Sequence, residues 1–469
     1  MLNYFPKYFT SKAIYLYLGV LTVVSFAFFS RALPFIWIAF GFVEVLMFFY
    51  FSNKLTLSWS KLSEKKFVVK LFWLAFLIRL VYVLFSYYFY ESRNGIPFEL
   101  GAADSLMYDD VSHSGASWIR GGNYDVFNRF TWLDISDRGY PTYLSYIYSI
   151  SDNSVLLARI FKAFWSAFMC VLIYKLTSRT FNESTGRIAA VLATFMPNLI
   201  YYTGIHLKET EMTFLVVAFL ERADYVIRNK NYNFINIALP VILAGLLFLF
   251  RTVVGGTALF SFFTVLIFTS NKVMGMGKRT LLIIWGIVAL SFFVGGKISV
   301  EIEQLWENRN DNQKNSMEYR SSIEGGNKFA KYASSTVFAP MIFVIPFPTM
   351  IHVPIQENQM MIHGGNFVKN IMAFFVIFAL IVIIKSGKWR DYTLIGSFML
   401  TYLIIIALSK FAASERFHVP AIPLLMIFAA YGISQVTNKV KKYFNWWLIF
   451  IFVAIVGWSW FKLAGRGAV

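Results

Sequence analysis

Apolar runs of roughly 20 residues, long enough to cross a hydrocarbon core of about 30 Å, recur along the whole chain. Of the 469 residues, 58% are hydrophobic and only 14% are charged, whereas a soluble protein carries roughly 25% charged residues. This composition excludes an ordinary soluble domain. Because an open sheet edge cannot be satisfied in lipid, we expect an all-α polytopic membrane protein.

About thirteen apolar segments can be delimited, and we expect most of them to be transmembrane helices. They cover residues 13–30, 33–52, 67–90, 155–174, 188–205, 211–227, 234–250, 252–269, 280–296, 367–384, 392–409, 419–436 and 446–463. Two long connections, 91–150 and 297–366, separate groups of spans, and connections of this length are usually functional or disordered. We expect both to lie on the outer face and to carry short juxtamembrane helices. The chain thus divides into 1–66 (two N-terminal helices), 67–296 (a transmembrane core that includes the first long connection), 297–366 (the second long connection) and 367–469 (the C-terminal helices).

The net charge follows from 43 Lys and Arg against 25 Asp and Glu, which gives +18. In a membrane protein this excess belongs to the cytoplasmic loops, so we infer no nucleic-acid partner. Basic residues gather in the loops at 53–66, 270–279 and 437–445. The N-terminus is then inside and the C-terminus outside. The single cysteine, Cys170, excludes an internal disulfide or a cysteine-rich metal site.

The second long connection contains an apolar stretch at residues 337–355 that is interrupted by prolines. Proline removes a backbone donor and disrupts a helix interior. We therefore expect this stretch to be re-entrant or to lie along the membrane surface, because a further span would turn the basic loop at 437–445 outward.

In the first long connection, the sequence GAADSLMYDDVSHSG places Asp104 after a turn of small residues and before a helix. Asp104 would be a helix N-cap in one interpretation. In the other it is a general base or a metal ligand at the outer end of a span. Tyr108 follows four residues later, and we expect Asp109 and Asp110 to be solvated residues on a helix face.

The turn between two later spans reads YYTGIHLKETEM and contains His206, Lys208, Glu209 and Glu211. In an extended turn, an E-x-E pair points both carboxylates to one side, which suits a divalent cation. The alternative is a helix N-terminus, where acidic residues complement the dipole.

Three further polar residues lie at the expected outer ends of spans. Arg251 directly follows the apolar run LAGLLFLF and would either extend to the lipid headgroups or bind a phosphate. Arg416 and His418 lie in SERFHVP, at the mouth of two spans.

Taken in order, several segments resemble the GT-C membrane glycosyltransferases, in particular the bacterial branch related to protein O-mannosyltransferases and lipid A aminoarabinose transferases. They are GAADSLMYDD, the stretch from RGYPTYLSY to LTSRTF, GRIAAVLATFMPNLIYYTGIHLKETEMTFL, LAGLLFLFRT and ERFHVPAIPLLMIFAAYGI. Two positions depart from the family pattern: Ala103 stands where a Gly usually precedes the Asp, and Lys208 where a Thr usually precedes the Glu.

The resemblance implies transfer of a sugar from a polyprenyl-phosphate carrier, by an inverting mechanism, to a lipid, glycan or protein acceptor. Asp104 would be the base or a metal partner, and Glu209 and Glu211 would join it around a divalent cation. Lys208, Arg251 and Arg416 would neutralise the carrier phosphate, because a phosphate leaving group needs charge compensation. Tyr108, His206 and His418 are further candidates for the site. No nucleotide or redox cofactor is expected.

The same resemblance implies a multi-pass bacterial inner membrane protein whose active site faces the periplasm. Two alternatives remain open. One is an O-antigen polymerase or ligase, which also uses polyprenyl-linked sugars and carries long outer loops. The other is a transporter or flippase of lipid-linked sugars, although the chain lacks the internal repeats that are typical of transporters.

Overall fold

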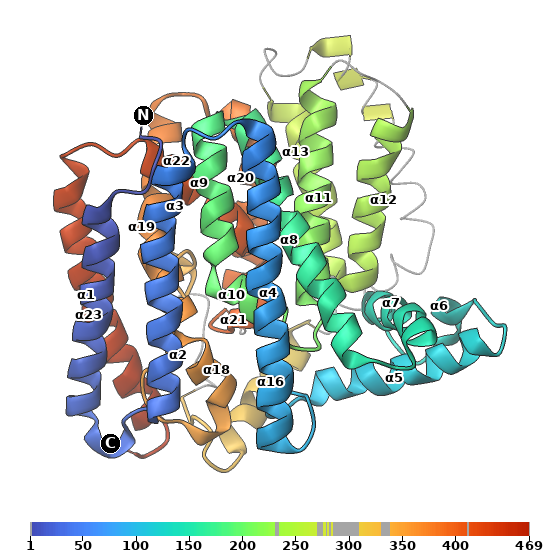
Figure 1. Ribbon diagram of the computed structural model, residues 1–469, viewed down its shortest axis with the longest axis horizontal. Coiled ribbons are helices and arrows are strands. Elements are labelled where there is room, and N and C mark those ends of the chain that lie inside the picture. Colours follow the sequence, from blue (N-terminus) through green and yellow to red (C-terminus); the bar gives the residue numbers. More distant parts are fainter. Residues whose placement is uncertain are drawn as a thin grey trace.

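The computed structural model describes residues 2–229, 234–269, 275–277, 279–280, 283–284, 309–329, 338–409 and 412–468. Throughout these residues the regular structure is helical, apart from one isolated β-bridge between Ala32 and Ile351. Most of the helices run side by side, and the two ends of the chain lie at opposite ends of the bundle (Figure 1).

The long axis of the bundle is followed by helices from every part of the chain. They are α1 (Lys7–Ala27), α2 (Phe35–Leu46), the π-helical turn η2 (Met47–Phe51), α3 (Ser52–Trp59), α4 (Glu64–Asn94), α8 (Val155–Thr180), α9 (Glu183–Phe195), α11 (Glu209–Arg228), α12 (Phe234–Phe250), α13 (Thr252–Phe268), α19 (His363–Lys385), α20 (Thr393–Leu408), α22 (Ile422–Ser434) and α23 (Val440–Ala464). Shorter or differently oriented elements are α5 (Ala103–Arg120), α6 (Val126–Arg129), α7 (Ile135–Ser151), α10 (Pro197–Tyr201), α16 (Arg309–Ser322), α18 (Glu357–Met361) and α21 (Glu415–His418), with 3-10 turns at Phe29–Arg31, Ala339–Met341, Pro354–Gln356, Trp389–Tyr392 and Val419–Ala421.

Eight helical segments of the described residues are long and apolar enough to cross a membrane. The helices α12 and α13 are apolar but shorter. The segment expected at 280–296 lies almost entirely outside the described residues, so the number of thirteen spans stays a prediction. The described part of the chain therefore forms a multi-pass, all-helical membrane protein.

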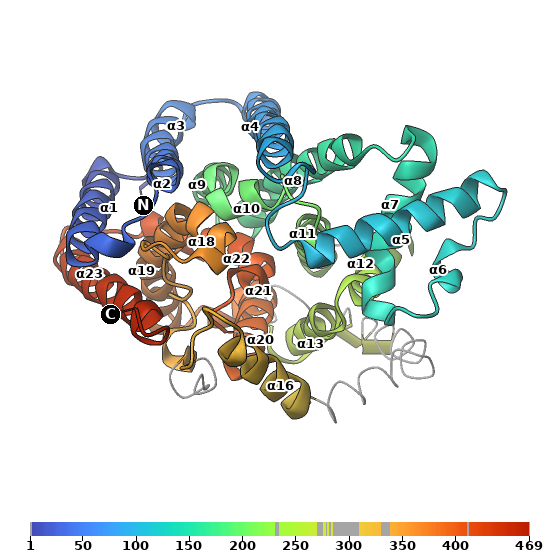
Figure 2. The ribbon, with the colours of Figure 1, turned by 90° about the horizontal axis from the view of Figure 1, so that it is seen from below.

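The bundle is centred on α22, in which every residue is buried. A helix that is apolar on all sides is expected to lie inside a bundle, and Figure 2 places α22 among its neighbours, seen from below. Gly432 allows the closest approach: a Cβ there would lie 2.1 Å from the carbonyl oxygen of Phe375 in α19. The peripheral helices α1, α4 and α23 bury one face only.

The segment expected as one span at 188–205 is broken into α9 and α10 at Pro197, and an irregular stretch then leads to α11. The last carbonyls of α9 lack helical partners. Arg79 of α4 donates to two of them, Ala193 O and Thr194 O, each at 3.2 Å. The break lets α11 begin inside the protein.

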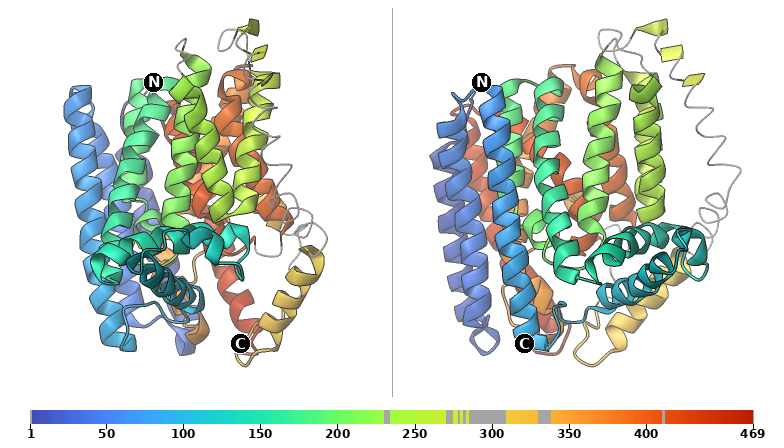
Figure 3. Two further views of the ribbon diagram at one scale, coloured as in Figure 1. Left: turned by 90° about the vertical axis from the view of Figure 1, so that its right-hand side faces the viewer. Right: turned by 45° about the vertical axis from the view of Figure 1, so that its right-hand side comes forward.

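An arm formed by α5, α6 and α7 lies across the bundle instead of along it (Figure 3). The helix α4 ends at Gly95, whose φ of +75° favours glycine, and the chain then turns into α5. Tyr108 of α5 and Tyr140 of α7 pack edge to face, with ring centroids 5.1 Å apart. This contact holds the first turns of α5 against α7.

The apolar stretch at 338–356 forms no helix longer than a 3-10 turn and is largely buried. Two of its carbonyl groups accept hydrogen bonds from α19: Lys369 donates to Ile345 O, and Asn370 Nδ2 donates to Pro346 O at 3.0 Å. Irregular backbone at membrane depth is tolerated where it is buried in protein.

The two ends of the bundle differ in the connections that they carry. The loops before α4 and before α23 lie at the end that holds the N-terminus, whereas α5, α6, α7 and α16 lie toward the end that holds the C-terminus (Figure 1). These two basic loops and the described helices of the long connections are therefore separated along the axis of the molecule.

Candidate functional site

Arg416 joins three segments that are distant in the sequence. Its Nη1 donates to Asp104 Oδ2 in the first turn of α5, and its Nε donates to Glu209 Oε1 at 2.5 Å in the first turn of α11. A guanidinium group is suited to two carboxylates because its donors form a rigid planar fork. The three residues form the centre of the candidate site.

Glu209 is fully buried and is the first residue of α11, where the helix dipole favours a negative charge. A second guanidinium reaches it, because Arg251 Nη2 lies 3.3 Å from the same Oε1 atom. The two guanidinium groups share the carboxylate of Glu209, so Arg251, Arg416 and Glu209 together carry one net positive charge. The predicted role of Arg251 and Arg416 as cations at one site is consistent with this geometry.

The structure does not support the interpretation of Arg251 as a residue that extends to lipid headgroups. Arg251 occupies the N-cap position of α13 without a side-chain cap, its side chain is 16% exposed, and its guanidinium carbon lies 4.9 Å from the centre of the Phe417 ring. It points into the protein because Glu209 and Phe417 offer an ion pair and a cation–π contact there.

Asp104 is the most accessible member of the site, with 51% of its side chain exposed. The N-cap interpretation is wrong: the N-cap of α5 is Ala102, and Asp104 lies one residue inside the helix. Its carboxylate is instead held by Arg416. A half-exposed carboxylate beside a guanidinium is a group that a substrate can reach.

Lys208 belongs to the wall of the site toward α7. Its Nζ pairs with Asp137 Oδ1 and donates to Ser136 O at 3.1 Å, and Tyr108 donates to the same oxygen of Asp137 at 3.1 Å. Burial lowers the pKa of Lys208, and the ion pair with Asp137 opposes that effect. The two sequence candidates Lys208 and Tyr108 thus meet on a carboxylate that the sequence analysis did not single out.

Glu211 lies apart from Glu209, toward α8. It pairs with the buried Lys162 at 3.7 Å, and Lys162 also donates to Ile205 O at 2.8 Å and to Leu207 O. Of the two interpretations of the E-x-E pair, the helix N-terminus is correct and the extended turn is wrong: both glutamates lie in the first turn of α11, where residues two positions apart point about 200° apart. Of the described residues, no group of three or more His, Cys, Asp or Glu is arranged to hold a metal ion.

His206 lies beneath the arm and heads a chain of polar contacts. Tyr148 donates to Asp109 Oδ1 at 2.5 Å, and its oxygen accepts from His206 Nε2 at 3.2 Å. Asp109 also lies 3.7 Å from His113. The expected solvated position of Asp109 is wrong, because it is 14% exposed and burial raises its pKa, whereas Asp110 is exposed as expected.

His418 supports the loop that carries Arg416. Its Nε2 donates to Ala412 O at 2.7 Å, and its Nδ1 accepts from Lys369 Nζ at 2.8 Å. Tyr402 donates to Phe417 O at 2.9 Å in the same loop. His418 is therefore linked to the site through the backbone of 412–418 and not through a contact with its carboxylates.

Three polar residues that build the surroundings of the site were missed by the sequence analysis: Asp137, Lys162 and Lys369. The two lysines lie inside segments expected to be apolar spans, and an ionisable group at membrane depth is a strong signal of function. That signal was available. Asp137 carries no comparable signal, because it stands in a loop rich in ordinary polar residues.

No protein-family model and no curated protein matches the chain. Among solved structures, the archaeal oligosaccharyltransferase AglB from Archaeoglobus fulgidus, in complex with an inhibitory peptide and a dolichol-phosphate, is 13% identical with a TM-score of 0.45. The oligosaccharyltransferase of the same organism in the apo form is 14% identical with a TM-score of 0.42. Each match covers 86% of this chain and 56% of the solved chain. This chain spans little more than half the length of those proteins.

Proposed function

We propose that this protein is a membrane glycosyltransferase that moves a sugar from a polyprenyl-phosphate carrier to an acceptor. One observation carries the proposal: Arg416 links the exposed Asp104 to the buried Glu209, and Arg251 adds a second guanidinium. This arrangement offers a base and a phosphate-binding pair side by side, at the mouth of a membrane bundle where a lipid-linked donor would present its head.

In the proposed reaction, an acceptor hydroxyl or amide attacks the anomeric carbon of the donor sugar. The bond between that carbon and the phosphate oxygen breaks, and its electron pair remains on the phosphate. The negative charge that develops there needs compensation, which Arg416 and Arg251 supply. A single displacement of this kind inverts the anomeric centre.

Asp104 receives the acceptor proton in this mechanism. In the resting protein its carboxylate is paired with Arg416. A donor phosphate competes for the same Nη1 group, so donor binding releases Asp104 toward the acceptor. Glu209 keeps Arg416 in place during this exchange, because the glutamate that accepts from Nε is fully buried.

Lys208 and Tyr108 complete the wall beside Asp104 through their shared contact with Asp137. The positive charge of the buried Lys208 stabilises the phosphate electrostatically, without direct contact. Tyr108 holds Asp137 and keeps the first turns of α5 and α7 together.

The carboxylates do not fit the three-ligand metal site that the resemblance implies. Arg416 lies between Asp104 and Glu209, and Glu211 is directed to Lys162. We therefore derive no step through a metal ion and assign its electrostatic role in this chain to Arg416.

The decisive experiment supplies a labelled polyprenyl-phosphate sugar and a mixture of candidate acceptors to the pure protein in nanodiscs. Asp104→Asn should reduce transfer by at least 100-fold, because an amide cannot accept the proton, while donor binding persists. The matched control is Asp110→Asn, an exposed acid on the same helix that should keep wild-type activity. Label retained without transfer by the wild type would instead identify a transporter, and full activity in Asp104→Asn would remove this residue from the chemistry.

A further inference from the structure

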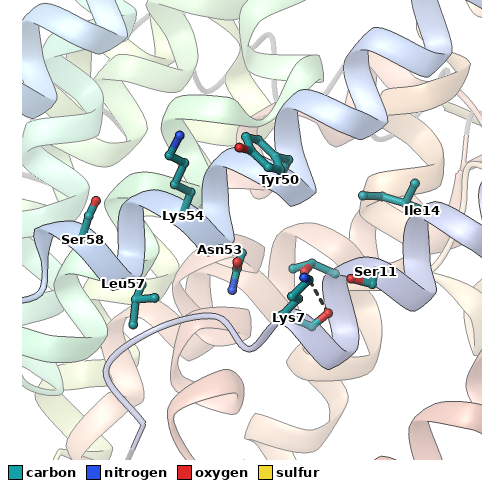
Figure 4. Close-up of a pocket in the computed structure, with 9 residues that line it drawn as sticks. Lys7, Ser11, Ile14, Tyr50, Asn53, Lys54, Leu57 and Ser58 are labelled. Atoms are coloured by element: carbon teal, nitrogen blue, oxygen red, sulfur yellow. Dashed lines mark hydrogen bonds between the residues drawn. The ribbon is translucent and has the colours of Figure 1, made fainter.

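A pocket of about 410 Å³ lies far from this site, between α1 and the helix formed by η2 and α3. Its volume falls within the range of roughly 300–1,000 Å³ found for small-molecule sites. Figure 4 shows that its side chains come from both helical segments: Lys7, Ser11 and Ile14 from one, and Asn53, Lys54 and Leu57 from the other. The end of the bundle that holds the N-terminus also holds this pocket.

The polar lining of the pocket is cationic and rich in hydroxyl groups. Lys7 and Lys54 supply two ammonium groups, and Ser11 and Ser58 supply hydroxyls. In the part of the chain that the structure describes, neither lysine has a carboxylate within ion-pairing distance. The Lys54 ammonium lies over the Tyr50 ring, 5.6 Å from its centroid. Two ammonium groups without a carboxylate partner, beside neighbouring hydroxyl donors, form a setting for a phosphate group.

The pocket is preformed, because the chain before α1 is tied to α3 at both backbone atoms of Phe5. Phe5 N donates to Thr56 Oγ1 at 2.9 Å, and Asn53 Nδ2 donates to Phe5 O at 2.6 Å. The Phe5 ring is buried and packs edge to face on Phe375. The wall of the pocket also contains Tyr50, from the π-helical turn η2, and such turns inside helices frequently occur at functional sites.

We propose that this pocket binds the phosphate headgroup of an anionic phospholipid. The phosphate lies between Lys7 and Lys54, and an acyl chain leaves past Ile14 along the groove between the helices. This site is separate from the proposed glycosyl transfer, since its ligand is neither donor nor acceptor and it lies at the other end of the bundle.

The apolar rim favours a lipid over free phosphate, which shares the same headgroup chemistry. Leu57 and Tyr50 line the opening and are 54% and 49% exposed. An inorganic anion gains nothing from these side chains, whereas a lipid covers them. Both helices are candidate membrane spans, and the basic loops at this end are those that the positive-inside rule assigns to the cytoplasm, where anionic lipids attract basic groups.

The test measures which lipids stay with the full chain. Protein is reconstituted with equal amounts of phosphatidylglycerol and phosphatidylcholine, extracted into detergent, and analysed by native mass spectrometry. We expect phosphatidylglycerol to be retained at least tenfold over phosphatidylcholine. Lys7→Ala combined with Lys54→Ala should abolish the preference, and Ser11→Phe should abolish it as well, by filling the pocket while both lysines remain.

The matched control is Lys61→Ala combined with Lys65→Ala, which removes two exposed lysines at the same end but outside the pocket. It should retain the wild-type preference. Equal retention of both lipids by the wild type, or an unchanged preference in Ser11→Phe, would overturn the proposal in favour of nonspecific charge attraction. Displacement of the lipid by millimolar inorganic phosphate would identify the pocket as a site for the free anion instead.

Discussion

At the scale of single residues, the two ion pairs of Arg416 differ in environment. The pair with Asp104 is half exposed and contributes about 0–1 kcal/mol. The pair with Glu209 is buried on the glutamate side, and removing one partner of a buried pair costs about 3–5 kcal/mol. The buried contact therefore fixes Arg416, while the exposed contact is free to exchange with a ligand.

Arg416→Lys should keep the charge but lose the fork that reaches two carboxylates at once. We expect kcat to fall by at least tenfold with a modest loss of stability, whereas Arg416→Ala should also lower the unfolding temperature, because Glu209 loses its closest cation. Transfer assays and thermal unfolding in detergent measure the two effects. Arg390→Lys, an exposed residue at the other end of the bundle, is the control; equal losses in both variants would count against the role of the fork.

Arg251 provides a second prediction at this scale. Since its guanidinium points to Glu209 and not to the lipid, Arg251→Ala should weaken donor binding and lower kcat by more than the ~0–1 kcal/mol of an exposed ion pair. Arg251→Lys should restore only part of each. Donor titration and turnover of both variants decide the matter, and full activity in the lysine variant would show that only a positive charge is needed.

The sequence predicts the individual polar residues better than their partners. Asp104, Glu209, Arg251 and Arg416 stand out because each is a charged group next to an apolar span. Their contacts depend on how three distant segments come together, and no local pattern contains that information. The E-x-E motif shows the limit: the spacing is compatible with a turn or a helix, and the buried N-terminus of α11 decides for the helix.

At the scale of elements, the first turn of α11 directs its two glutamates to different partners. Glu209 meets guanidinium groups of the site, and Glu211 meets Lys162 inside the bundle. The positions of the apolar helices follow from hydrophobicity, but this separation does not. This separation depends on the helix break at Pro197. The sequence contains the proline, but a proline is also compatible with the first turn of a helix, so its presence does not determine where the break lies.

Substitutions of the two glutamates should therefore have different effects on activity and stability. Glu209→Gln should reduce transfer strongly, because Arg251 and Arg416 lose the charge that positions them. Glu211→Gln should mainly reduce stability, by up to about 3–5 kcal/mol, because Lys162 is left buried without its counter-ion. Transfer rate and unfolding temperature are measured on both proteins, and a double variant with Lys162→Met should recover part of the stability lost in Glu211→Gln. The same phenotype in both single variants would contradict separate roles.

At the scale of the whole molecule, hydrophobicity and the positions of basic residues determine most of what the sequence predicts. They predict the all-helical class and the approximate positions of the long apolar helices among the described residues. They do not predict that α5 and α7 lie across the bundle, because an amphipathic helix can lie either along the bundle or across it. That orientation accompanies the contact between Asp104, at the start of α5, and Arg416, which completes the site.

The orientation of the bundle in the membrane gives the last prediction. The basic loops before α4 and before α23 lie at the end that holds the N-terminus, and α16 lies toward the opposite end. By the positive-inside rule, the first end is cytoplasmic, so the candidate site opens to the outer face. With the buried Cys170 replaced by Ser, single cysteines at the exposed positions Lys61 and Ser322 report the two ends. In intact cells, an impermeant thiol reagent should label Ser322→Cys but label Lys61→Cys only after permeabilisation. Labelling of Lys61→Cys without permeabilisation would show the opposite topology. The proposed chemistry would then lie on the cytoplasmic side, where a donor carried on the outer leaflet could not reach Asp104.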